Sequence, residues 1–340
     1  MRAAVVTSFG TPPSCQDFPA PVPGSPDEVL IDVLAAGLHP RVRSQADGSH
    51  YTSSDELPLI PGIDGVGRAP DGTLRYFVLP DTTMGAMAEQ TLVDVRRSVV
   101  LPEGTDPVLI AAAMNPAMSS WIALRRRTSF QAGQSVLVLG ATGNAGRLAV
   151  QIAKHLGAGQ VIAAGRRADR LAALEEADVT VCLAGDGDGD GDGDGDGDGD
   201  GDGATASEGE GDAGLDRLAE VAGDVDVVID YVWGQPTAEA MRAVVTGRTD
   251  RDRPLTWIEV GSVAGPTAAI PSAALRAARL QIVGSGQGSV PTRDILAELP
   301  ALAEVIAVGN FRLDARAVPL ADVETAWKET DSEQRLVITP

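Results

Sequence analysis

Six short apolar stretches between residues 136 and 283 constrain the fold of this 340-residue chain more than any other feature. Segments with the apolar spacing of helices separate most of them, which is typical of parallel strands covered by helices on both faces of a sheet. We therefore predict an α/β fold with a doubly wound, six-stranded parallel sheet in the order 3-2-1-4-5-6. The expected strands cover residues 136–139, 161–164, 179–183, 225–232, 256–260 and 280–283.

The first strand leads directly into a glycine-rich turn and a helix, in the segment VLVLGATGNAGRLAV (136–150). Its glycines form GxxGxxG, a variant of the fingerprint that binds the pyrophosphate of a dinucleotide. Gly140 permits the tight turn, Gly143 lets the backbone approach a pyrophosphate, and Gly146 lets the helix pack on the strand. Free amides and the dipole at the start of the helix favour an anion. The predicted binding residues of this turn are Gly140, Thr142, Gly143, Asn144, Ala145 and Gly146.

The end of the second strand decides which dinucleotide is bound. An acidic residue about 20 positions after the glycines accepts from the ribose of NAD, whereas a basic residue accommodates the extra phosphate of NADP. Here the strand ends VIAAGRR, so that Gly165, Arg166 and Arg167 occupy this place. Because a guanidinium pairs with phosphate through two hydrogen bonds, we predict NADP(H) as the cofactor. The alternative is that two solvated arginines simply open the helix expected over residues 168–177.

The first 118 residues have a different pattern. Short alternating apolar stretches such as EVLIDVLAAG (28–37) are separated by segments rich in proline and glycine, which is typical of a small β-rich unit. The chain length therefore indicates two domains. No charged leader with an apolar core begins the chain, and no 18 apolar residues run without interruption, so we expect a cytoplasmic protein with no membrane partner.

Neither cysteines nor histidines are spaced as metal ligands. Cys15 and Cys182 lie far apart, outside any CxxC pattern, and the three histidines form no HxxxH or HExxH motif. We therefore expect no metal site.

A run of alternating glycine and aspartate follows the third expected strand, and we predict that residues 185–212 form a low-complexity, disordered insertion. The alternative, a calcium-binding tract, lacks the apolar anchors or the bidentate glutamate that such sites need. Twelve carboxylates lie in residues 186–212, so the rest of the chain carries a net charge of −9 against −21 for the whole. With no stripe of lysine and arginine, we expect no nucleic-acid partner.

Three segments together resemble the medium-chain dehydrogenase/reductase superfamily, specifically its zinc-free quinone oxidoreductase branch. They are PGIDGVG (61–67), VLVLGATGNAGRLAVQIAKHLGA (136–158) and DVDVVIDYV (224–232). The resemblance covers nearly the whole chain. It implies a GroES-like catalytic domain formed by residues 1–118 and 289–340, with RLVITP near the C-terminus as a returning strand, and a Rossmann NAD(P)-binding domain over residues 119–288.

The resemblance also implies chemistry without a metal. Zinc-dependent members carry a cysteine in the loop that here reads AAGLHPRVRS, and a His-Glu pair where this chain has Ile63 and Asp64. Since Ile63 cannot bind zinc, the nicotinamide must be held against an already electrophilic carbon, with hydrogen-bond donors beside the oxygen that gains charge. A quinone or an α,β-unsaturated carbonyl compound meets that need. Two alternatives stay open: a reductase of enoyl thioesters or aldehydes, and a non-catalytic NADPH-binding redox sensor.

The same resemblance supplies candidate catalytic residues, namely His39, Tyr51 and Ser119. The match around HPRVRSQADGSHY is loose, so His50 could replace either His39 or Tyr51. The proton comes from solvent or from a donor such as Tyr51. The resemblance also implies that Asn115 and Ser119, both just before an expected crossing helix, line the cofactor cleft.

Loops after the fifth and sixth strands complete the predicted site. In relatives these backbone segments meet the nicotinamide half of the cofactor, and the exposed edge of the sixth strand pairs two chains, so we expect a homodimer. The candidate residues are Val260, Gly261, Ser262, Gly284 and Ser285.

Overall fold

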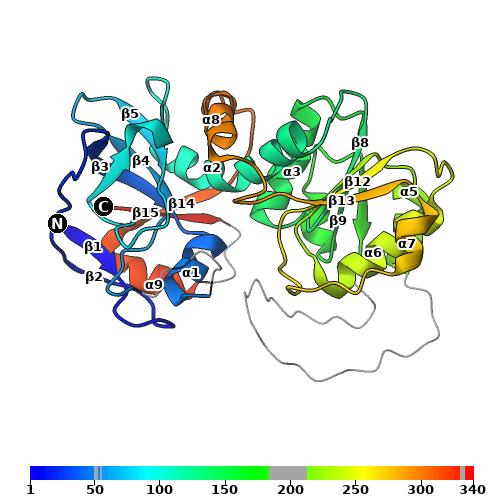
Figure 1. Cartoon of the computed structure of the whole chain (residues 1–340), viewed down its shortest axis with the longest axis horizontal. Coiled ribbons are helices and arrows are strands. Elements are labelled where there is room, and N and C mark those ends of the chain that lie inside the picture. The colour runs from blue at the N-terminus through cyan, green and yellow to red at the C-terminus, as the bar shows by residue number, and fades with distance from the viewer. Residues whose placement is uncertain (50–52, 54–55, 184–212, 330–333) are drawn as a thin grey trace. The chain divides into compact units, whose positions relative to one another are not determined.

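A computed structural model describes residues 1–49, 53, 56–183, 213–329 and 334–340 (Figure 1). The Gly-Asp insertion predicted at 185–212, and the candidates His50 and Tyr51, lie outside these residues. The described chain divides into two compact units, which we call the β-rich unit (Met1–Met118 with Arg293–Pro340) and the Rossmann unit (Ser119–Thr292).

A six-stranded parallel sheet forms the centre of the Rossmann unit, in the order β10-β9-β8-β11-β12-β13. This is the predicted order, with the third strand at one edge and the sixth at the other. Isoleucine, valine and leucine fill the central strands, which are buried from both sides. The strands are β8 (Ser135–Leu139), β9 (Gln160–Gly165), β10 (Val179–Cys182), β11 (Val227–Asp230), β12 (Leu255–Glu259) and β13 (Leu280–Gly284).

Helices cover both faces of this sheet, with α3 on one side and α5 and α6 on the other (Figure 1). Leu218 of α5 and Met241 of α6 pack into one apolar cluster with Leu137 and the fully buried Trp257. The burial of both sheet faces explains why the strand sequences are apolar at nearly every position. The helices are α3 (Asn144–His155), α4 (Ala168–Ala172), α5 (Ala213–Ala222), α6 (Gly234–Gly247) and α7 (Ser272–Ala277).

The helix predicted over residues 168–177 is wrong beyond Ala172. The chain turns there, with the amide of Ala177 donating to the carbonyl of Leu174, and Asp178 is brought to the start of β9. The Asp178 carboxylate accepts from the amide of Val161 and pairs with Lys154 of α3. These contacts between distant residues fix the turn, and the local helical pattern of the sequence could not predict them.

The β-rich unit contains a seven-stranded sheet and a separate β1-β2 pair. Its C-terminal strand β15 runs antiparallel to β3, so the end of the chain returns to the N-terminal sheet as predicted. The elements of this unit are β1 (Arg2–Val5), β2 (Ser14–Asp17), β3 (Glu28–Gly37), α1 (Pro40–Asp47), β4 (Asp64–Arg68), β5 (Leu74–Val78), β6 (Gln90–Asp94), η1 (Val95–Arg97), β7 (Ser98–Val100), α8 (Thr292–Ala307), β14 (Ala315–Pro319), η3 (Leu320–Asp322), α9 (Val323–Lys328) and β15 (Arg335–Thr339).

A long apolar helix, α2 (Pro107–Ile122), continues into the π-helical turn η2 (Ala123–Arg127). The prediction that Asn115 and Ser119 precede a helix is wrong, because both lie inside α2 despite the proline between them. The segment Pro107–Arg127 is long and apolar enough to cross a membrane by length and composition alone. However, 67% of its most apolar 18-residue window is buried within the protein, which is typical of a core helix.

Candidate active site

The glycine turn after β8 is shaped by close backbone contacts. Gly140 has a φ of +78°, a left-handed conformation that side chains other than glycine rarely adopt. A Cβ atom on Gly146 would lie 2.1 Å from the carbonyl oxygen of Gly140. Gly140 and Gly146 are therefore required by the turn itself, as the fingerprint predicted.

Gly143 is different, because no contact among the described residues requires a glycine at this position. Its φ is −75°, which any residue adopts, and the nearest atom to an added Cβ would be 3.7 Å away. It is the N-cap of α3, and no side chain caps the helix. The amides of the first turn, at Asn144, Ala145 and Gly146, have no carbonyl four residues earlier within the helix to accept from them. This open, uncapped helix start is a site for an anion.

An arginine that sequence reasoning missed lies beside this turn. The Nε of Arg147 donates to the carbonyl of Thr142 at 3.1 Å, which holds the guanidinium next to the glycines. A cation near the start of a helix is disfavoured by the helix dipole unless an anion is present. That mismatch was the signal in the sequence, and it adds a positive charge to the anion site.

The predicted adenosine-phosphate residues lie at the end of β9. A Cβ on Gly165 would lie 3.0 Å from Thr142, so the glycine lets the turn pack against the strand. Arg166 is exposed. Arg167 pairs with Asp169 through its Nε and Nη2 at 3.2 and 3.1 Å, and these hydrogen bonds lower the pKa of Asp169. A phosphate bound by Arg167 would share that arginine with a carboxylate.

Ser119 forms a hydrogen bond with Tyr231, whose hydroxyl oxygen lies 2.8 Å from its Oγ. Tyr231 directly follows β11, and its amide donates to the carbonyl of Leu139 at the end of β8. Burial raises the pKa of Tyr231 to about 12, although hydrogen bonds with Ser119 and Ser120 act in the opposite direction. The phenol is therefore protonated at neutral pH. The sequence indicated Ser119 as a candidate, but no pattern in it indicated Tyr231.

Asp230 organises the chain after β11. Its buried carboxylate accepts from the amides of Val232 and Trp233 at 2.8 and 3.1 Å. It also accepts from the hydroxyl of Thr237 at 2.7 Å and the indole of Trp257 at 2.9 Å. Four hydrogen bonds to one buried carboxylate fix the loop between β11 and α6.

The predicted nicotinamide-side residues share this edge of the sheet. Asp230 pairs with Glu259 in the parallel register, and Glu259 pairs with Gly284. The amides of Val260 and Gly261 both donate to the backbone carbonyl of Asp230. Val260, Gly261, Ser262, Gly284 and Ser285 thus lie at the carboxyl ends of β12 and β13, on the same edge as the glycine turn.

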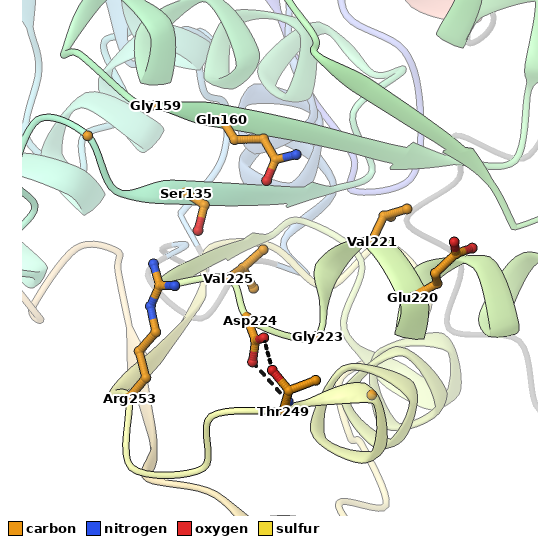
Figure 2. Close-up of a pocket in the computed structure, with 12 residues that line it drawn as sticks. Ser135, Gly159, Gln160, Glu220, Val221, Gly223, Asp224, Val225, Thr249 and Arg253 are labelled. Carbon is orange, nitrogen blue, oxygen red and sulfur yellow. Dashed lines mark hydrogen bonds between the residues drawn. The ribbon is translucent and has the colours of Figure 1, made fainter.

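A cavity of about 500 Å³ lies at the opposite, amino-terminal edge of the sheet (Figure 2). Four of its polar side chains already have partners: Asp224 accepts from the amide and hydroxyl of Thr249, and Arg253 and Ser135 both donate to Asp226. These bonds tie the strand starts together, so the carboxyl edge is the better candidate site. The lining residues are Gly133, Ser135, Gly159, Gln160, Glu220, Val221, Gly223, Asp224, Val225, Gly247, Thr249 and Arg253.

In the β-rich unit, His39 is almost completely buried, with 2% of its surface exposed. Its Nε2 lies 3.1 Å from a carboxylate oxygen of Asp64, whose other oxygen accepts from the hydroxyl of Tyr76 at 2.8 Å. Beyond the end of β3 the amide of Leu38 donates to the carbonyl of Leu336, and the charge of the neighbouring Arg335 acts against a charge on His39. Burial lowers the pKa of His39, and the bond with Asp64 only partly opposes this. His39 is therefore a neutral member of a buried network.

Among the described residues, no three His, Cys, Asp or Glu side chains lie close enough together to hold a metal ion. At the place where zinc-dependent relatives carry a histidine, Ile63 is 5% exposed and offers no donor atom.

A doubly wound sheet with an uncapped glycine turn and basic residues after its second strand defines a dinucleotide-binding protein. No family model matches the chain. A probable NADPH-dependent quinone reductase of Emericella nidulans is 30% identical over the full length of both chains. An NADPH-dependent alkenal/one oxidoreductase of Arabidopsis thaliana is 30% identical over 161 residues, which cover 43% of this chain and 42% of that protein.

A structural comparison supports the fold. The quinone oxidoreductase of Thermus thermophilus, solved alone and with NADPH, matches with a TM-score of 0.75 over 100% of both chains at 23% identity. This chain belongs to the zinc-free quinone oxidoreductase branch of the medium-chain dehydrogenase/reductase superfamily.

Proposed function

We propose that this protein is a zinc-independent, NADPH-dependent reductase that transfers hydride to a quinone or an α,β-unsaturated carbonyl compound. The observation that carries the proposal is the open, uncapped start of α3 at Gly143, within the fold of a family whose members are named for this activity. NADPH supplies the hydride, and the chain's own residues hold and orient it.

The residues present fit such a cofactor. In the proposal, the amides after Gly143 and the cation of Arg147 bind the pyrophosphate, because both present positive charge at the same turn. Arg166 and Arg167, after Gly165, bind the extra phosphate of NADPH. The loops after β12 and β13 contact the remaining half. The full proposed set is Gly140, Thr142, Gly143, Asn144, Ala145, Gly146, Gly165, Arg166, Arg167, Asn115, Val260, Gly261, Ser262, Gly284 and Ser285.

Catalysis in this proposal depends on neutral hydrogen-bond donors. Ser119 presents a hydroxyl at the carboxyl edge of the Rossmann sheet, and Tyr51 or solvent supplies the proton. His39 is buried and bonded to Asp64, which supports a positioning role rather than proton donation.

The proposal is tested by mixing the protein with NADPH and a panel of quinones, enones, an enoyl thioester and an aldehyde, and following absorbance at 340 nm. Rapid loss of absorbance with quinones or enones is expected. Turnover confined to the thioester or the aldehyde would replace the proposed substrate class. Binding of NADPH without turnover across the panel would instead favour a redox sensor.

We also propose that the protein is a cytoplasmic homodimer acting on a small molecule. Both cysteines are free thiols, which fits a reducing compartment. Among the described strands β13 pairs with β12 alone, and an open sheet edge is stabilised when a second copy covers it. Light scattering on the purified protein should give twice the mass of the 35.0 kDa chain, and a monomer mass at micromolar concentration would contradict the dimer.

A further inference from the structure

Tyr231 occupies the point where the doubly wound sheet changes direction. It directly follows β11, which lies beside β8 although the two are far apart in sequence. A Cβ on Gly140 would lie 3.3 Å from the Cβ of Tyr231, and a Cβ on Gly261 would lie 3.2 Å from its carbonyl oxygen. Tyr231 thus lies between the glycine turn and the loop after β12. In such folds, ligands bind in the crevice at this switch point.

The position of the Tyr231 side chain is fixed at both ends. Its amide donates to the carbonyl of Leu139 at 3.3 Å, and its hydroxyl lies 2.8 Å from the Oγ of Ser119 in α2. The residue is still partly exposed, and its hydrogen bond with Ser119 is only partly buried. A side chain that is held at both ends and still partly exposed is what a binding site requires.

The loop that follows Tyr231 is strained, which is an independent sign of function. Trp233 has a φ of 53° and a ψ of −164°, a backbone conformation close to a region that is almost restricted to glycine. The hydrogen bonds from Val232 and Trp233 to the buried carboxylate of Asp230 hold the loop in this shape. Strain of this kind persists where a precise local geometry is needed.

The two halves of a dinucleotide lie on opposite sides of the switch point. If the start of α3 binds the pyrophosphate and Arg166 binds the adenosine phosphate on the β9 side, the other half lies over β11 and β12. We propose that Tyr231, held by Ser119, binds the ribose-nicotinamide half of NADPH. This inference rests on the proposed function.

The chemistry of the pair fits this half of the cofactor rather than a phosphate. A protonated phenol and a serine hydroxyl are neutral, and together they donate and accept hydrogen bonds, as ribose hydroxyls and a carboxamide also do. Phosphates are instead served by the amides and arginines on the other side of the turn. Because the pKa of Tyr231 is about 12, its hydroxyl stays a donor across the neutral pH range.

Titration of three variants with two ligands tests the inference. Tyr231→Phe removes the hydroxyl and keeps the ring, Ser119→Ala removes its partner, and Ser135→Ala is the matched control. Ser135→Ala also removes a hydroxyl, which donates a hydrogen bond to Asp226, but at the opposite edge of the same sheet. The ligands are NADPH and adenosine 2′,5′-bisphosphate, which lacks the ribose-nicotinamide half.

We expect Tyr231→Phe to weaken NADPH binding about three- to tenfold, as the loss of one neutral hydrogen bond does, and to leave the bisphosphate unchanged. Ser119→Ala should act in the same direction with a smaller effect. Ser135→Ala should leave the affinity for both ligands unchanged.

Four results separate the possible failures. If the wild-type protein binds neither ligand, the proposed function itself is wrong. If the wild type binds both and Tyr231→Phe binds NADPH equally well, only this inference falls. It also falls if Tyr231→Phe weakens both ligands alike, because the residue then acts by packing against Gly140. Should Tyr231→Phe fail to fold, Ser119→Ala decides, and unchanged NADPH binding by that variant overturns the inference.

Discussion

Replacing Gly143 with alanine separates binding from folding at the glycine turn. Within the described part of the chain, the atom nearest to the added methyl group lies 3.7 Å away, and the φ of −75° suits alanine. A gain of about 0.4–1 kcal/mol from the stiffer unfolded chain is offset by a loss of similar size, because alanine is a poorer N-cap than glycine. The free energy of unfolding should therefore change by less than about 1 kcal/mol.

The same methyl group occupies the space through which the backbone would approach a pyrophosphate. NADPH affinity should fall at least about tenfold, which is about 1.4 kcal/mol of binding energy. Gly146→Ala is the contrasting variant. Its Cβ would lie 2.1 Å from the carbonyl oxygen of Gly140, so we expect a loss of about 3 kcal/mol in stability.

Calorimetric titration with NADPH and urea unfolding measure the two effects separately. The reasoning is refuted if Gly143→Ala folds normally and binds NADPH as tightly as the wild type. It is also refuted if Gly143→Ala is destabilised as much as Gly146→Ala.

Three further predictions concern other parts of the molecule. Replacing both Arg166 and Arg167 by alanine should weaken NADPH binding about tenfold or more in a fluorescence titration and leave NADH binding unchanged, since charged hydrogen bonds contribute about 1.5–3 kcal/mol each. Equal losses of affinity for both cofactors would contradict the assignment. Asp230→Asn leaves the buried donors of Thr237 and Trp257 facing an amide that cannot accept from all of them. The free energy of unfolding, measured in urea, should therefore fall by about 3 kcal/mol. A fall below about 1 kcal/mol would show that the carboxylate is dispensable. Burial holds the pKa of His39 below 6.5, so the unfolded chain takes up the proton first as the pH falls. The contribution of His39 to stability is therefore present above pH 6.5 and lost below it. Between pH 8 and pH 5 the wild type should lose more stability than His39→Asn, and equal losses would contradict this.

The sequence predicts the Rossmann sheet well because its signals are local. Apolar strands, glycines at a turn and helical spacing are each written within about 20 residues. The sheet order and the roles of Gly140 and Gly146 followed from them. The helix after Arg167 is shorter than its pattern indicates, because tertiary contacts of Asp178 end it.

The missed parts of the candidate site depend on contacts between distant residues. Tyr231 and Ser119 are 112 positions apart, so no pattern in the sequence pairs them. The burial of His39 depends on the strand register that brings the C-terminal strand to β3. The resemblance placed Asn115 and Ser119 just before a helix, yet both lie inside α2, which continues through Pro116.

Amides at the start of α3 are proposed to bind the pyrophosphate of NADPH. A crystal structure of the protein grown with NADPH tests this most directly. We expect pyrophosphate oxygens within about 3 Å of the amides that follow Gly143, as hydrogen bonds require. Cofactor density that lies away from this helix start would contradict it.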